Sequence, residues 1–220
     1  MLIKITFPVM LLLFITGIGN AQYFESVNKE AERILISLSD GDSINSSGLA
    51  TLINFLDSET DDNVSKSFPD INQKNIDSLK NHLNEFETES KNISVDSSFV
   101  LFNDWYLHFQ NIFYDFSKQK FFSSPKTKLL LFSTSMSCYC TLKMSRNQTV
   151  DLLKFISDND DKYDYWIVDS YWYNELQIEY ETLFAPSVVI MDGNNKVLQI
   201  IEYEEKMLAQ LANYLSTFKN

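Results

Sequence analysis

The chain has 220 residues, of which 45% are hydrophobic, so it is long enough to bury a core of its own. Its formal net charge is −12, from 18 basic and 30 acidic residues that are dispersed along the sequence. Nucleic-acid phosphates and anionic membrane surfaces attract basic proteins, so this charge argues against both as partners. Two cysteines are too few for a disulfide scaffold in a chain of this length.

Residues 1–21 have the pattern of a cleavable signal peptide. Lys4 provides a positive charge, residues 5–18 are largely apolar, and the small residues at 19–21 resemble a cleavage site. The apolar stretch is shorter than the ~20 residues that span a bilayer. An uncleaved N-terminal anchor is the alternative. We expect an exported, periplasmic or secreted protein with no membrane span in the mature chain.

Residues 22–120 are expected to form a mostly helical N-terminal region. Apolar residues recur at helical spacing over 23–38, and shorter patterns over 49–56 and 71–86 predict two further helices. Residues 99–116 hold aromatic side chains at spacings of three, four and seven. This density predicts a buried or interface-forming helix rather than a cofactor site.

The two histidines, His82 and His108, fall in different predicted helices and lie far in sequence from the cysteines. A single histidine on a helix is usually a surface residue or a hydrogen-bonded core residue, and nothing in this spacing predicts a metal site. From the sequence we therefore expect no metal centre and no other cofactor.

The pattern changes after residue 126, where short apolar runs alternate with helical segments. Strands are predicted over 129–132, 165–168, 188–191 and 196–201, the last two joined by an Asp-Gly-Asn-Asn turn. Helices are predicted over 149–157, 175–183 and 204–218, and the first of them begins near the cysteines. The order β-α-β-α-β-β-α predicts an α/β domain over 126–219.

Both cysteines directly follow the first predicted strand, with only Tyr139 between them. Outside the cytosol such thiols are not kept reduced by glutathione. A bridge that closes so short a loop removes little unfolded-state entropy, so structural stapling is a weak explanation for the pair. At a helix N-terminus, however, the positive end of the helix dipole lowers the pKa of a thiol and favours the reactive thiolate.

Three features together resemble the thioredoxin fold. Cys138 follows the first strand at the expected start of a helix, and the strand YWIVDS ends in an acidic residue, Asp169. The stretch LFAPSVVIMDGNNKVL places Pro186 before a strand, a Gly/Asn turn and a second strand. It resembles the family's cis-proline loop with its following hairpin. The resemblance covers residues 126–219 and implies a central sheet flanked by helices.

The resemblance implies thiol–disulfide exchange with protein thiols or disulfides, with Cys138 and Cys140 as the catalytic residues. In thioredoxin-like proteins the cis-proline loop lies against the active cysteine and pairs with substrate. By this resemblance Ala185 and Pro186 line the substrate side, and Tyr139 and Thr141, beside the cysteines in the sequence, are further substrate-binding candidates.

The sequence departs from the family pattern in two ways. The family's usual motif has two residues between its cysteines, so Thr141 occupies the second family position and Cys140 an intervening one. The family's buried carboxylate has no counterpart in the apolar run 129–132. Three functions stay open: thiol–disulfide exchange, an inactive thioredoxin-like binding or assembly module, and Cu(I) binding through the two thiolates.

Overall fold

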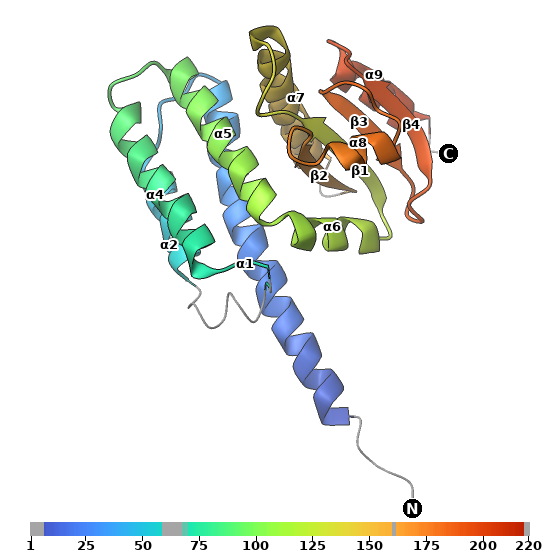
Figure 1. Ribbon diagram of the computed structural model, residues 1–220, viewed down its shortest axis with the longest axis horizontal. Coiled ribbons are helices and arrows are strands. Elements are labelled where there is room, and N and C mark those ends of the chain that lie inside the picture. The colour runs from blue at the N-terminus through green and yellow to red at the C-terminus, as the bar shows by residue number, and fades with distance from the viewer. Residues whose placement is uncertain (1–6, 59–67, 69, 160–161, 218–220) are drawn as a thin grey trace, which may run out of the picture.

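The computed structural model describes residues 7–58, 68, 70–159 and 162–217, with side chains from residue 22 onward. Helix α1 (Phe7–Ser39) runs without a break through the predicted cleavage position, and its N-terminal end extends away from the other elements (Figure 1). Residues 1–6 of the predicted signal peptide lie outside the described residues, and cleavage stays a prediction. Within the described ranges, no helix is long and apolar enough to cross a membrane.

The other helices of the N-terminal region are α2 (Ser46–Asp57), α4 (Gln73–Ser90), α5 (Val95–Ile112) and α6 (Tyr114–Ser123). Polar side chains cap the N-termini of three of them. Asn45 accepts a hydrogen bond from the backbone of α2, Asn72 forms a reciprocal capping box with α4, and Ser94 caps α5. These caps pair backbone N–H groups that the first helical turn leaves without partners.

The aromatic segment 99–116 forms two helices, α5 and α6, rather than the single helix predicted. Phe113 separates them, with backbone angles outside the α-helical range (φ −94°, ψ 21°). Its buried ring packs against Tyr23, Phe24 and Phe68, with ring centroids 6.3, 5.4 and 5.2 Å away. We attribute the break to this packing, after which α6 crosses toward the sheet (Figure 1).

The described strands form a four-stranded sheet with the order β2-β1-β3-β4. Strand β1 (Thr127–Ser133) pairs parallel with β2 (Tyr163–Asp169) and antiparallel with β3 (Ser187–Met191), and β4 (Val197–Glu202) pairs antiparallel with β3. The intervening and closing helices are α7 (Tyr139–Asp158), α8 (Asn174–Glu179) and α9 (Met207–Ser216). This topology confirms the expected thioredoxin-like fold and the predicted element order.

Helix α8 is shorter than the predicted helix over 175–183. Glu181 has a positive φ of 54°, a conformation that a helix cannot contain, and the amide of Thr182 returns to the carbonyl of Gln177 at 2.9 Å. The chain therefore leaves the helix early and enters the loop before Pro186.

Alternate residues of the strands pack into two separate apolar layers, as the period of two in a strand requires. One layer joins α7, α9 and the N-terminal helices, and its members from the sheet include Leu129, Leu131, Ile167, Val188 and Ile190. The other joins α6 and α8, and its members from the sheet include Leu130, Phe132, Trp166, Val168 and Val189. The helical region thus shares one continuous core with a face of the sheet.

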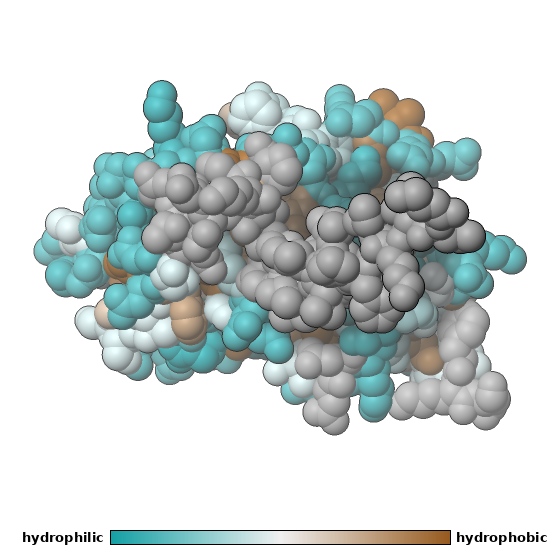
Figure 2. All heavy atoms as spheres, turned by 90° about the horizontal axis from the view of Figure 1, so that it is seen from below, coloured by the Kyte–Doolittle hydropathy of each residue, from teal (hydrophilic) through white to brown (hydrophobic). Residues whose placement is uncertain are grey.

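The face shown in Figure 2 is mostly hydrophilic, and hydrophobic residues appear there as separate small areas among the described atoms. The division of the chain into residues 22–120 and 126–219 stays a prediction, and the two regions share a core.

A polar cluster joins α1, α5 and β2 at this shared core. The carboxylate of Glu32 accepts hydrogen bonds from Tyr106 and Tyr165, and the side chain of Asn28 donates to the Tyr165 hydroxyl at 3.0 Å. Desolvation outweighs the hydroxyl hydrogen bonds and raises the pKa of Glu32 from 4.5 to about 7. The cluster therefore holds a carboxyl group that takes up a proton near neutral pH.

We predict that Glu32→Gln stabilises the protein at pH 8 but not at pH 4. Because folding raises the pKa of Glu32 to about 7, the folded state retains a proton that the unfolded state releases. The parent protein therefore loses stability as the pH rises from about 4.5 to about 7, by a free energy on the order of 3 kcal/mol. Denaturant unfolding across this pH range measures the decrease in the free energy of unfolding. In Glu32→Gln this decrease should largely disappear.

Glu30→Gln is the matched control for this prediction. Glu30 lies on the same helix and pairs with Arg33 rather than with the tyrosines. A difference between Glu32→Gln and the parent that stays constant from pH 4 to pH 8 would contradict the prediction.

Candidate active site

The loop between β1 and α7 carries the cysteines to the surface. Strand β1 ends at Ser133, and Cys138 is the N-cap residue of α7, with extended backbone angles (φ −66°, ψ 156°). Buried Asp169, at the end of β2, accepts hydrogen bonds from the amides of Ser135 and Tyr171, both at 3.1 Å. The acidic strand end noted in the sequence thus anchors the loop before Cys138.

Both cysteines are free thiols on the surface, and their Sγ atoms lie 2.9 Å apart. The Sγ of Cys138 also lies 3.2 Å from the hydroxyl of Thr141. Hydrogen bonds from Cys140, then from the side chain and backbone of Thr141, lower the pKa of Cys138 from 9.0 to about 6. A thiol with this pKa is mainly thiolate at neutral pH, which is the nucleophilic form.

Tyr203 extends this hydrogen-bonded chain, and the sequence analysis missed it. Its hydroxyl lies 3.1 Å from that of Thr141, and its own amide donates to the carbonyl of Pro186 at 2.9 Å. The residue has a positive φ of 46° directly after β4. The register that pairs Ser187 with Glu202 places residue 203 beside Pro186, but this register becomes known only from the folded hairpin.

The loop before β3 faces the same site. The Ala185–Pro186 peptide bond is cis, and the carboxylate of Glu202 accepts hydrogen bonds from the amides of Leu183 and Phe184. Ala185 lines a hollow of about 550 Å³ whose walls also include residues of the cysteine loop and of α7. The surface between the predicted substrate loop and the cysteine loop is therefore concave.

The substrate-binding candidates do not all meet in this hollow. Ala185 and Thr141 both line it. Pro186 does not line it, but its carbonyl accepts a hydrogen bond from the amide of Tyr203, which does. The side chain of Tyr139 does not line it and is 77% exposed. Their roles toward a substrate stay predictions.

Large apolar side chains are exposed around the thiols. Leu183 and Phe184 are 77% and 59% exposed, and Phe184 packs against Tyr203 with ring centroids 6.0 Å apart. Tyr171 and Trp172 form an edge-to-face pair with ring centroids 5.2 Å apart, also exposed. The sequence analysis did not identify Leu183 and Phe184, which lie in the loop before Pro186, as candidates for an interface.

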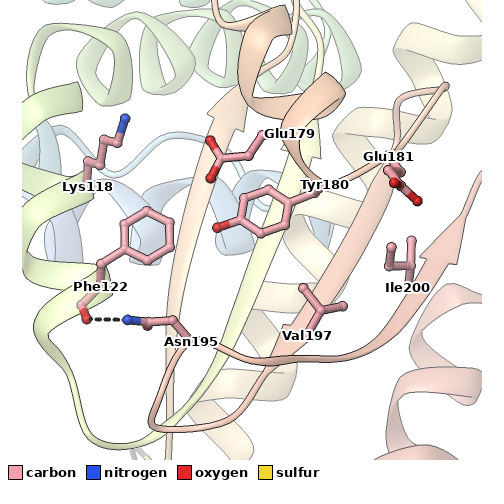
Figure 3. A pocket seen from close by; sticks show the side chains of 8 residues that line it. All are labelled: Lys118, Phe122, Glu179, Tyr180, Glu181, Asn195, Val197 and Ile200. Carbon is pink, nitrogen blue, oxygen red and sulfur yellow. Dashed lines mark hydrogen bonds between the residues drawn. The ribbon is translucent and has the colours of Figure 1, made fainter.

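A second hollow of about 620 Å³ lies between α6, the end of α8 and β4 (Figure 3). Phe122, Tyr180 and Val197 line it, and the side chain of Asn195 donates to the carbonyl of Phe122 at 3.1 Å. Asn195 belongs to the β3–β4 turn, at the end of the sheet opposite the cysteines. Neither thiol lines either hollow, but Thr141, whose hydroxyl lies 3.2 Å from the Cys138 sulfur, lines the first one, so the chemistry points to that hollow.

No family model matches the sequence, and no curated protein sequence is significantly similar to it. Among solved structures, the germline-specific thioredoxin Deadhead of Drosophila melanogaster aligns with 48% of this chain and 92% of its own, at 16% identity and a TM-score of 0.40. A structure titled DsbH Oxidoreductase aligns over 47% and 76% of the two chains, at 20% identity and a TM-score of 0.32. A designed protein aligns over 49% and 86%, at 14% identity and a TM-score of 0.37.

We predict that Thr141→Val raises the pKa of Cys138, because the thiolate loses the hydroxyl that lies 3.2 Å from its sulfur. The measurement is the rate of alkylation by iodoacetamide as a function of pH. It is made in a Cys140→Ser background, so that Cys138 is the one thiol in the chain. Thr141→Ser keeps a hydroxyl and serves as the control. Equal midpoints for the valine and serine variants would show that the hydroxyl does not act on Cys138.

Proposed function

We propose that this protein carries out thiol–disulfide exchange with other proteins outside the cytosol, with Cys138 as the attacking residue and Cys140 as the resolving residue. The observation that carries the proposal is an exposed thiol with a pKa of about 6 whose sulfur lies 2.9 Å from a second free thiol. An exported setting, supported by the pattern of residues 1–21, adds a compartment in which disulfides persist.

The proposed reaction has two exchange steps. The Cys138 thiolate attacks one sulfur of a substrate disulfide, forms a mixed disulfide, and releases the other substrate sulfur as a thiolate. The Cys140 sulfur then loses its proton and attacks Cys138, which releases the second substrate thiolate and leaves a Cys138–Cys140 disulfide. The substrate gains two electrons and the protein loses two. The same steps in reverse oxidise a substrate dithiol.

Neighbouring groups have separate parts in this scheme. Thr141 donates a hydrogen bond to the Cys138 thiolate, and Tyr203 positions Thr141 from the other side. Strand β1 offers no carboxylate to accept the proton of Cys140, since residues 129–132 are apolar and buried. Cys140 is exposed, so its proton goes to solvent.

The surface around the thiols favours an extended polypeptide as substrate. The hollow beside Cys138 is bordered by Met136, Leu183 and Phe184, all exposed, and by the backbone of the proline loop. Apolar side chains of a substrate segment would be desolvated there while its disulfide approaches the thiols.

A binding or assembly module without catalysis is the second candidate, and the exposed Tyr171–Trp172 pair favours it. Large aromatic side chains of this kind are typical of interfaces. In that case the thiols are dispensable, and a protein with both cysteines replaced keeps its partner. The Cu(I) alternative from the sequence requires both thiolates and is lost in the same variant.

We predict that the two cysteines act in sequence on a peptide disulfide offered to the reduced protein in a single turnover. Cys140→Ser should accumulate a mixed disulfide between Cys138 and the peptide, because no thiol is left to resolve it. Cys138→Ser should react far more slowly, because it lacks the thiol with the lowered pKa. Intact-mass spectrometry of samples quenched with acid gives both results.

The matched pair of single variants is its own control, since each keeps one exposed thiol. If Cys138→Ser reacts as fast as the parent, or if Cys140→Ser forms no mixed disulfide, Cys138 is not the attacking residue.

A further inference from the structure

The fold brings together the two histidines that the sequence analysis treated as unrelated. His82 on α4 and His108 on α5 have ring centroids 5.6 Å apart, with an angle of 53° between the ring planes. The two helices are fixed to each other by the indole of Trp105, which donates to the carbonyl of Leu79 at 3.0 Å, and by further apolar packing. The imidazoles are therefore held close by a packed helix pair.

This separation suits a shared metal ion. Imidazole nitrogen binds Zn²⁺ at about 2.0–2.1 Å, so two rings on one tetrahedral ion have centroids roughly 5 Å apart. The Nε2 atom of His108 is shielded from solvent, and no described residue forms a hydrogen bond with it.

The surroundings of the histidines are acidic. A hollow of about 300 Å³ beside them is lined by Glu85, Glu89 and Asp104. Glu85 is three residues after His82 and Asp104 four residues before His108, so each carboxylate shares a helix face with an imidazole. Asp104 also forms an ion pair with Arg146 at 3.2 Å. The negative charge of these carboxylates attracts cations to the hollow.

We propose that His82 and His108 bind a divalent transition-metal ion, of the class of Zn²⁺ and Cu²⁺, in the hollow between α4 and α5. Imidazole ligands favour these ions over Mg²⁺ and Ca²⁺, which prefer oxygen. Across the described residues, no group of three or more His, Cys, Asp and Glu side chains is arranged to hold a metal. The two imidazoles are therefore the protein ligands of the proposed site, and water completes the coordination. This site is independent of the proposed thiol chemistry.

The test is titration with Zn²⁺ by calorimetry in the Cys138→Ser, Cys140→Ser protein, so that thiolates do not compete for the metal. We expect one Zn²⁺ per chain, and His82→Ala or His108→Ala should weaken its binding by at least about tenfold, since even changes behind metal ligands cost 10–100-fold. Cu²⁺ should bind more tightly than Zn²⁺ and should show nitrogen couplings in its electron paramagnetic resonance spectrum.

His82 is exposed, so His82→Ala should leave the fold intact, which circular dichroism without metal verifies. Asn84→Ala, at an exposed position of the same helix outside the hollow, is the matched control and should bind Zn²⁺ like its parent. Absence of Zn²⁺ binding, or equal affinity in His82→Ala and Asn84→Ala, would overturn the proposal.

Discussion

Burial of β1 on every side is the constraint on which the rest of the structure depends. Residues 129–132 have no exposed surface, because β2 and β3 pair with the two edges of β1 and helices cover both faces. A slip by one residue would move each of these side chains to the opposite apolar layer. At its end, Ser133 pairs with Asp169, and the amide of Ser170 donates to the Ser133 carbonyl at 2.9 Å. The position of Cys138 follows from this fixed strand end.

The same burial governs where charged groups lie. Lys128, at the start of β1, is buried, and its ammonium donates to the carbonyl of Gly193 at 3.1 Å and the side chain of Asn195 at 2.7 Å. At Gly193 an added Cβ would come within 2.2 Å of the Pro125 carbonyl oxygen, so this turn requires glycine. Glu32 reaches the sheet from α1 and meets tyrosine hydroxyls. Buried Lys128 and partly buried Glu32 both have specific hydrogen-bond partners, as their burial demands.

Much of the fold could be predicted from the sequence, because buried runs and helical periodicity are local patterns. The strand before Cys138, the helix after it and the hairpin after Pro186 were all predicted in order. The break at Phe113 was not, since its cause is packing against rings from distant segments. Tyr203 beside Thr141 and His82 beside His108 were also missed, because each contact depends on how elements pack.

An ion pair connects the histidine hollow with the helix that carries the thiol site. Asp104 lines the histidine hollow, and its partner Arg146 lies on α7, the helix that begins at the cysteines. The two sites nevertheless rest on different chemistry, an activated thiolate in one and paired imidazoles in the other. Substitutions of the cysteines leave both histidines in place, and substitutions of the histidines leave both cysteines in place.

Equilibrium titration of the protein in glutathione redox buffers, with the free thiols counted by mass after alkylation, tests the pairing of Cys138 with Cys140 most directly. We expect a single reversible two-electron transition in which both thiols disappear together to give an intramolecular disulfide. If both thiols stay free under mildly oxidising conditions, or if each forms only its own glutathione adduct, the cysteines are not a redox pair.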